Sequence, residues 1–296
     1  MSGSSTTIGV IYVLMIILTL PLHLLIIWIV LRNKKFRKLT AYGIMVNMSF
    51  CECTLTIGHF MGGLMSVSQT TFHSYFQNVG GCFVCASWVG IVLFIFLLSL
   101  DRFLVFIGFN MTDHSEKRFF MVTSVLAWLT VFAIFMIHLL PKQTVVYNVS
   151  LSVYQLAMTS DTQTIYIEHM IIFFFLIVAF LLAMGTVIAI IVKRNIHSTH
   201  FKLNSGEARL LIQSAIIFAY FAVIRLAWHF APYSEAVTIA LGLATQAVGL
   251  LNPIVYLIFN ASIRKHVLTA LCVPTKVNIF HISTSTTKLP GTPLAT

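Results

Sequence analysis

Charged side chains are scarce in this chain of 296 residues. Aspartate, glutamate, lysine and arginine together make up 9% of it, whereas soluble domains carry about 25%. Only 8 residues are acidic against 18 basic ones, so the formal net charge is +10. This scarcity excludes an ordinary soluble domain, and the 58% of hydrophobic residues indicates a chain that lies in a membrane.

Cysteines are few as well, and they form no recognisable framework of pairs. The five are Cys51, Cys53, Cys82, Cys85 and Cys272. The Cys-x-x-Cys spacing at Cys82 to Cys85 has no second pair of ligands and no redox-type setting, so we expect no metal site and no cofactor. Metal-spaced His/Asp/Glu clusters, a Ser–His–Asp set and a phosphate loop are also missing, and we expect no enzyme.

Long apolar runs are the most prominent feature that is present. We place seven membrane spans at 8–31, 40–66, 79–106, 119–140, 164–192, 209–230 and 236–259. Each can cross a bilayer as a helix, the form in which a lipid-embedded backbone satisfies its own hydrogen bonds. Residues 1–7 lack the basic start of a signal peptide, so we expect the first span to be retained. The prediction is an all-α membrane protein, a seven-transmembrane helix bundle over 8–259 with a short extracellular N-terminus at 1–7.

The basic residues gather in alternate connecting segments. Five lie in 32–38, others follow the third and fifth spans or lie in the tail, and the opposite side has only Lys142. The positive-inside rule then predicts an extracellular N-terminus and a cytoplasmic C-terminus. We therefore attribute the positive charge to topology and to attraction for anionic membrane lipids, and we expect no nucleic acid as a partner.

The residues after the last span predict a short helix and a tail. Segment 260–272 places four apolar residues on one helical face: Ile263, Val267, Leu268 and Leu271. This pattern is typical of an amphipathic helix at the membrane surface. Cys272 is a candidate for palmitoylation, with an unmodified thiol as the alternative. Residues 273–296 are polar, and we expect a disordered cytoplasmic tail whose Ser/Thr cluster at 283–287 could be phosphorylated.

Two polar motifs lie at the inner ends of spans. Asp101 and Arg102 interrupt the apolar stretch "LLSLDRFLVF" in the third span, and "LLNPIVYLIFN" in the seventh contains Asn252, Pro253 and Tyr256. Charges in an apolar setting are costly, although a snorkelling arginine at the interface would explain the first motif alone. Both motifs together, on these spans, resemble those of rhodopsin-like G-protein-coupled receptors. The short loops, the richness in phenylalanine and the stretch "RLLIQSAIIF" are most similar to the nematode serpentine chemoreceptor families.

The resemblance implies a chemosensory receptor of the plasma membrane. It would bind a small molecule between the outer helix halves and activate a heterotrimeric G protein, with an arrestin-like protein as a further partner. Arg102, paired with Asp101, would hold the inactive state and contact the G protein. Glu207 would be a second partner of Arg102, or else a solvated acid at a helix start. The other residues of this switch would be Asn252, Pro253 and Tyr256. The alternative is a seven-span ligand-gated channel or a small-solute transporter, which predicts internal repeats that we do not find.

Two charged residues lie deeper in the spans. We expect Glu52 to couple the second and seventh spans through water or Asn252, with a protonated core acid as the alternative. Arg225 would bind an anionic ligand or form an internal salt bridge, for example with Glu52. The other ligand candidates are polar or aromatic residues of the outer halves: His59, Trp88, His138, Tyr166, Glu168, His169, Trp228, His229 and Gln246.

Several features of the resembling receptors are missing here. The outer half of the third span has no aspartate for an amine, and the seventh has no lysine for retinal. Segment 141–163 has no cysteine, so the disulfide that usually ties this loop to the third span cannot form. The same loop contains Asn148 in the acceptor sequence "NVS", and we expect glycosylation there.

Overall fold

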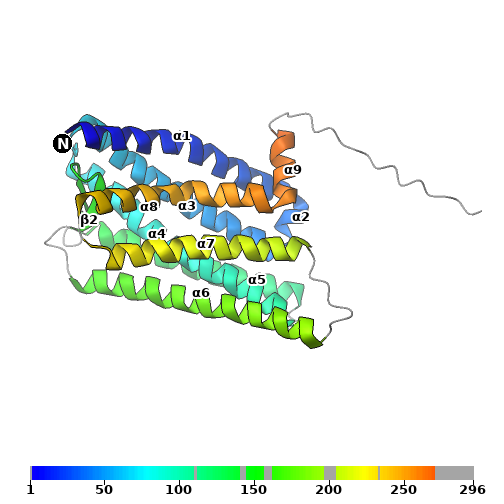
Figure 1. Ribbon diagram of the computed structural model, residues 1–296. Helices are drawn as coiled ribbons and strands as arrows, with labels where there is room; N and C mark the ends of the chain where they lie inside the picture. The colour runs from blue at the N-terminus through cyan, green and yellow to red at the C-terminus, as the bar shows by residue number, and fades with distance from the viewer. Residues whose placement is uncertain are drawn as a thin grey trace, which may run out of the picture.

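The computed structural model describes residues 2–109, 112–140, 145–156, 162–196, 205–232 and 234–270. Its long helices run side by side as one bundle (Figure 1). They are α1 (Ser2–Arg32), α3 (Thr40–Ser68), α4 (Ser74–Ile107), α5 (Asp113–His138), α6 (Thr162–Ile196), α7 (Ser205–Phe230) and α8 (Glu235–Phe259). Each overlaps one predicted span over most of its length, and the all-α, seven-helix membrane fold is confirmed.

Helix α3 differs from the other long helices in composition. Judged by length and composition alone, six described helices are long and apolar enough to cross a membrane, and α3 is not among them. Its 29 residues suffice in length, since about 20 cross the hydrocarbon core. Its inward side carries buried polar residues, including Ser49, Glu52 and Ser66. Because α3 packs between α1 and α4, these groups contact protein rather than lipid.

Several elements extend beyond the predicted boundaries. Helix α1 begins at Ser2 rather than at residue 8, so most of the predicted N-terminal segment is helical. A short helix that we did not predict, α2 (Lys34–Arg37), follows α1, and the side chain of Asn33 caps it by accepting a hydrogen bond from the Lys35 amide at 2.9 Å. Side-chain caps of this kind satisfy the free amides of a helix start and place its first residue.

Helix α4 lies at the centre of the bundle and packs against α3, α5, α6 and α7. Its contact with α3 depends on glycine: a Cβ atom at Gly58 would lie 2.8 Å from both the carbonyl oxygen of Gly80 and Cγ2 of Val84. Lipid tails are as apolar as leucine, so close packing of small residues, rather than hydrophobic burial, drives such contacts. Most of the length of α4 is thus packed between neighbouring helices.

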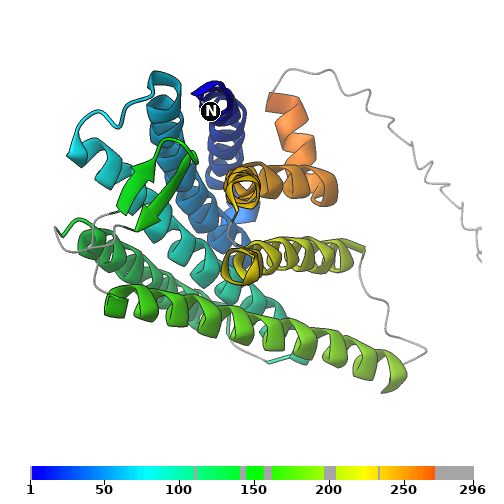
Figure 2. The same ribbon diagram turned by 60° about the vertical axis from the view of Figure 1, so that its left-hand side comes forward.

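The loop between α5 and α6 contains a β-hairpin that the sequence analysis did not predict. Strands β1 (Val145–Asn148) and β2 (Val153–Leu156) pair antiparallel, with Val145 opposite Leu156. The hairpin lies at the end of the bundle that also holds the N-terminus (Figures 1 and 2).

Hydrogen bonds rather than a disulfide attach the hairpin. The Tyr154 hydroxyl donates to the carbonyl of Gly58 at 2.9 Å, and the Val145 amide donates to Oδ1 of Asn78 at 3.2 Å. The hydroxyls of Tyr147 and Ser66 share a hydrogen bond of 2.8 Å. Burial raises the pKa of Tyr147 to about 12, so this hydroxyl stays protonated and can donate. Cys82, on the adjacent helix α4, is a free thiol.

The last described helix, α9 (Ala261–Ala270), lies with α2 at the other end of the bundle (Figure 1). Ile263 and Val267 are buried against the bundle, while Arg264 and Lys265 are exposed, as an amphipathic surface helix requires. Leu271, Cys272 and the predicted tail at 273–296 lie outside the described residues.

Candidate functional site

A cavity of about 250 Å³ opens among the helices beneath the hairpin. Helices α1, α3, α4, α6, α7 and α8 contribute to its wall, and β2 covers it. The lining residues are Tyr12, His59, Val84, Cys85, Trp88, Val153, Tyr154, Glu168, His169, Ile172, Arg225, Trp228, Gly242 and Thr245. The cavity is mostly apolar and aromatic with a few polar groups, which is typical of small-molecule sites.

Six of the ten sequence-predicted ligand residues line this cavity: His59, Trp88, Glu168, His169, Arg225 and Trp228. The structure does not bring the other four to it. Tyr166 is 65% exposed, His229 is exposed beside the ring of Phe173, and Gln246 donates instead to the backbone carbonyl of Tyr12 at 3.0 Å. His138 is fully buried and lies behind Glu168.

Arg225, on α7, carries a positive charge to the cavity wall. Its Nε and Nη2 atoms are buried and have no hydrogen-bond partner among the described residues. The guanidinium lies 5.6 Å from the centre of the Phe173 ring, which can stabilise a cation through its π face. The alternative expectation is an internal salt bridge, for example with Glu52. Among the described residues no carboxylate forms an ion pair with Arg225, and Glu52 lies beside Asn252 and His23 instead.

Aromatic groups hold the remaining wall of the cavity in place. Trp228 donates from Nε1 to the Thr245 hydroxyl at 2.9 Å, which ties α7 to α8. The His59 ring contacts Tyr12 edge-on at 5.7 Å between ring centres. With these contacts the cavity has a largely preformed shape, so a ligand would find most side chains already positioned.

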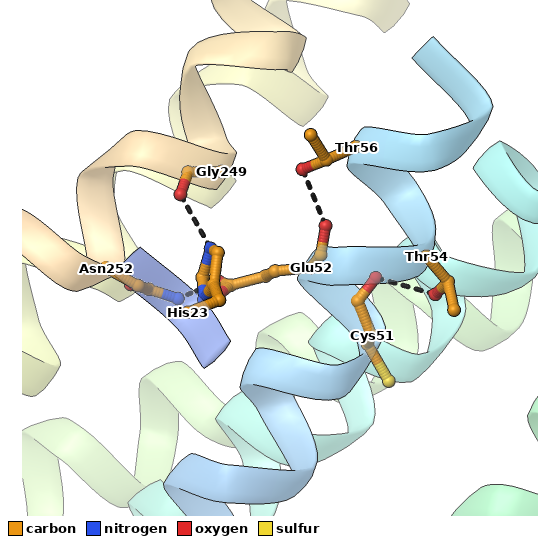
Figure 3. Close-up of polar contacts among 7 residues, drawn as sticks. All are labelled: His23, Cys51, Glu52, Thr54, Thr56, Gly249 and Asn252. Atoms are coloured by element: carbon orange, nitrogen blue, oxygen red, sulfur yellow. Dashed lines mark hydrogen bonds and ion pairs between the residues drawn. The ribbon is translucent and has the colours of Figure 1, made fainter. Parts of the chain in front are cut away.

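A buried polar network lies deeper in the bundle and joins α1, α3 and α8 (Figure 3). Glu52 accepts a hydrogen bond from Nδ2 of Asn252, and its other carboxyl oxygen lies 3.5 Å from Nδ1 of His23. Nε2 of His23 donates to the carbonyl oxygen of Gly249 at 2.7 Å, since a carbonyl can only accept. Glu52 and Asn252 are thus in direct contact.

His23 is the member of this network that the sequence analysis missed. A signal for it existed, because an ionisable residue in the middle of an apolar span is costly and usually functional. His23 is fully buried and stands in the first span, close to Pro21. The sequence did not indicate which other span it would face.

The Asp101–Arg102 pair lies near the end of α4 away from the cavity. Nη2 of Arg102 lies 3.2 Å from Oδ2 of Asp101, and Asp101 is buried. On α8, Tyr256 is fully buried and its hydroxyl has no partner within the described part of the chain. Pro253 lies inside the same helix, which continues to Phe259. Glu207 falls in the first turn of α7, and its side chain lies outside the described residues.

The cavity also contains residues that the sequence analysis did not select. Tyr12, Tyr154 and Thr245 belong to three separate elements, α1, β2 and α8. Nothing in their local sequence distinguishes them from packing residues, and Tyr154 reaches the cavity only because the hairpin folds over the bundle.

Seven long helices, with a cavity at one end and an acid–arginine pair towards the other, define a seven-transmembrane receptor architecture. The family model for "Serpentine type 7TM GPCR chemoreceptor Srt" matches residues 2–279. The chain therefore belongs to this family of serpentine chemoreceptors, which confirms the resemblance drawn from its motifs. A comparison with curated proteins gave no match.

Proposed function

We propose that this chain binds a small molecule in the cavity beneath the hairpin and thereby activates a heterotrimeric G protein at the opposite end of the bundle. The observation that carries the proposal is the position of α4. Its residues Cys85 and Trp88 line the cavity, and the same helix bears Asp101 and Arg102. Asp101 lies thirteen positions after Trp88, a distance of about 20 Å along a helix.

Helix α8 connects the same two regions. Thr245 lines the cavity, and Asn252 and Tyr256 follow it towards the inner end. Asn252 is held by Glu52 of α3, so a ligand that moves α8 must also alter this buried contact. A ligand that prefers one of two arrangements of the helices shifts the population towards it, which is the general basis of receptor activation.

The orientation that we propose for the bundle in the membrane rests on the distribution of basic residues. The five basic residues of 32–38 and the exposed Arg264 and Lys265 lie at the end opposite the hairpin. The positive-inside rule supports a cytoplasmic location for this end, and hence an extracellular hairpin and cavity in the plasma membrane. An arrestin-like partner would use the phosphorylated tail, and palmitoylation of Cys272 would fix α9 to the membrane.

Within the cavity, we assign Arg225 to an anionic group of the ligand. A buried guanidinium with two nitrogens lacking partners is costly, and a carboxylate or phosphate would satisfy both at once. The aromatic wall formed by Trp88 and Trp228 would contact the apolar part of such a ligand.

The test is a G-protein nucleotide-exchange assay in cells that express the chain, with a small-molecule library as stimulus. We expect Arg102→Ala to abolish ligand-stimulated exchange at unchanged surface abundance. Arg118→Ala is the matched control, because this arginine is exposed near the start of α5 and outside the Asp101–Arg102 pair. Normal exchange by Arg102→Ala, or no response of the wild type to any compound, would refute the proposed function.

A further inference from the structure

Three potential metal ligands from three different helices meet at the side of the cavity. They are Cys85 of α4, His138 at the last position of α5, and Glu168 of α6. Their sulfur, imidazole nitrogen and carboxylate oxygen atoms all lie within 4.8 Å of one another. In the part of the chain that the structure describes, no other three His, Cys, Asp or Glu side chains cluster in this way.

We propose that this cluster binds a zinc ion and that the ion presents an open coordination position to the cavity. The inference does not depend on the G-protein role proposed above. Thiolate, imidazole and carboxylate are the three ligand types that zinc uses in proteins, at about 2.3, 2.0–2.1 and 2.0–2.2 Å respectively. Bound ligand atoms around a tetrahedral ion would then lie about 3.3–3.7 Å apart.

The geometry is close to this requirement. Nε2 of His138 and Oε2 of Glu168 are 3.0 Å apart and in direct contact, so these two atoms already face each other and need to separate by only a few tenths of an ångström to admit the ion. The longest separation in the cluster, at most 4.8 Å, has to shorten by about 1 Å. A change of this size is within the range of a side-chain rotation at Cys85 or Glu168.

Charge favours the ion as well. Zinc binding deprotonates the thiol, so Cys85 and Glu168 together supply two negative charges to a divalent cation. The site is then neutral overall, which reduces the cost of burying it among helices. Arg225 lines the same cavity and opposes a cation there, but it forms no ion pair with the cluster among the described residues.

The position beside the cavity determines what the site could do. Cys85 and Glu168 line the cavity, whereas His138 lies behind them. Three protein ligands leave a fourth zinc position for water or for a donor atom of a bound molecule, as in zinc sites that exchange ligands. Ligands of this site would be small molecules with a thiol, amine or carboxylate donor, and the ion would tie the outer ends of α4, α5 and α6 together.

The experiment is a titration of the purified, chelator-treated receptor in detergent micelles with Co²⁺, a spectroscopic substitute for zinc. We expect one equivalent of Co²⁺ to produce a thiolate-to-cobalt charge-transfer band that Zn²⁺ then removes by competition. Cys85→Ser should lose this band. Cys82→Ser is the matched control and should keep it, because Cys82 is a buried thiol one turn earlier on α4 and is not in the cluster.

A second measurement distinguishes loss of the metal site from misfolding of a variant. Glu168→Gln can still hydrogen-bond to His138, and we expect it to fold, to show the helical circular dichroism of the wild type, and to lose the rise in melting temperature that Zn²⁺ gives the wild type. The proposal is overturned if the wild type shows no thiolate band and no zinc-dependent rise. It is also overturned if Cys85→Ser retains the band or Cys82→Ser loses it.

Discussion

Glu52 and Arg225 are both ionisable groups inside the bundle, but their surroundings differ. Glu52 is fully buried and lies beside Asn252 and His23, so its carboxyl oxygens have polar groups from two other helices within reach. Arg225 faces a cavity, and two of its nitrogens have no partner within the described residues. The first arrangement joins helices, and the second is the basis of the ligand contact that we propose for Arg225.

Replacement of Glu52 tests the network at this scale. Glu52→Ala leaves the amide of Asn252 without a hydrogen-bond partner. An unsatisfied buried polar group of this kind lowers the free energy of unfolding by about 1–3 kcal/mol. Glu52→Gln still offers an oxygen that can accept a hydrogen bond from Asn252, so this variant should lose much less stability. Thermal denaturation of the purified receptor measures the difference, and an alanine variant as stable as the wild type would show that this contact contributes nothing.

Replacement of Arg225 tests the assigned ligand contact. For carboxylate agonists found in the screen, we expect Arg225→Gln to raise the half-maximal concentration about 10- to 100-fold, since charge-assisted hydrogen bonds contribute about 1.5–3 kcal/mol. His229→Ala is the control, because His229 is exposed and does not line the cavity. An equal loss for uncharged agonists would argue against a specific role for the charge.

At the scale of elements, helix α3 can carry polar residues because it packs against other helices. It contains glycines and buried polar residues, and it is held between α1 and α4 rather than facing lipid on all sides. At Gly58 the adjacent backbone of α4 leaves no room for a side chain. The position of α4, and with it the link between cavity and Arg102, depends on this contact.

A pair of glycine substitutions on α3 isolates this effect. Gly58→Ala places a methyl group 2.8 Å from the Gly80 carbonyl oxygen and should destabilise the bundle by about 1–3 kcal/mol, the usual cost of overpacking. Gly43→Ala, which meets nothing within 4 Å, should be neutral or slightly stabilising because alanine favours helix. Melting temperatures compare the two, and equal effects would contradict the close-packing argument.

At the scale of the whole molecule, the two ends of the bundle differ in character. The N-terminus and hairpin lie at one end, and α2 and α9 with their basic residues lie at the other (Figure 1). The cavity belongs to the first end and the Asp101–Arg102 pair lies towards the second. The ligand site and the G-protein contact that we propose therefore lie towards opposite ends of the bundle.

Epitope tags at the two termini test the orientation that we propose. An N-terminal tag should bind antibody on intact cells, and a C-terminal tag should bind it only after the cells are permeabilised, because the basic segments retain that side in the cytoplasm. Antibody binding to a C-terminal tag on intact cells would contradict both the orientation and the proposed G-protein contact.

Much of the fold was predictable from the sequence for one physical reason. Lipid cannot hydrogen-bond to a backbone, so long apolar runs become helices whatever their partners are. The spans, the amphipathic helix and the Asp101–Arg102 motif follow from local composition and spacing. The hairpin was not predictable in this way, because it forms through contacts of Tyr154 and Val145 with distant helices.

For the candidate site, the sequence identified polar and aromatic residues but not their neighbours. It selected Glu52 and Arg225, since charges in apolar spans are rare and costly. By itself it determined the number of spans, the helical class and the charged residues within them. The tertiary structure alone decided that His23 contacts Glu52, that Cys85 meets His138 and Glu168, and that Tyr166 faces away. Such pairings depend on the rotation and packing of helices distant in the chain, which no local pattern specifies.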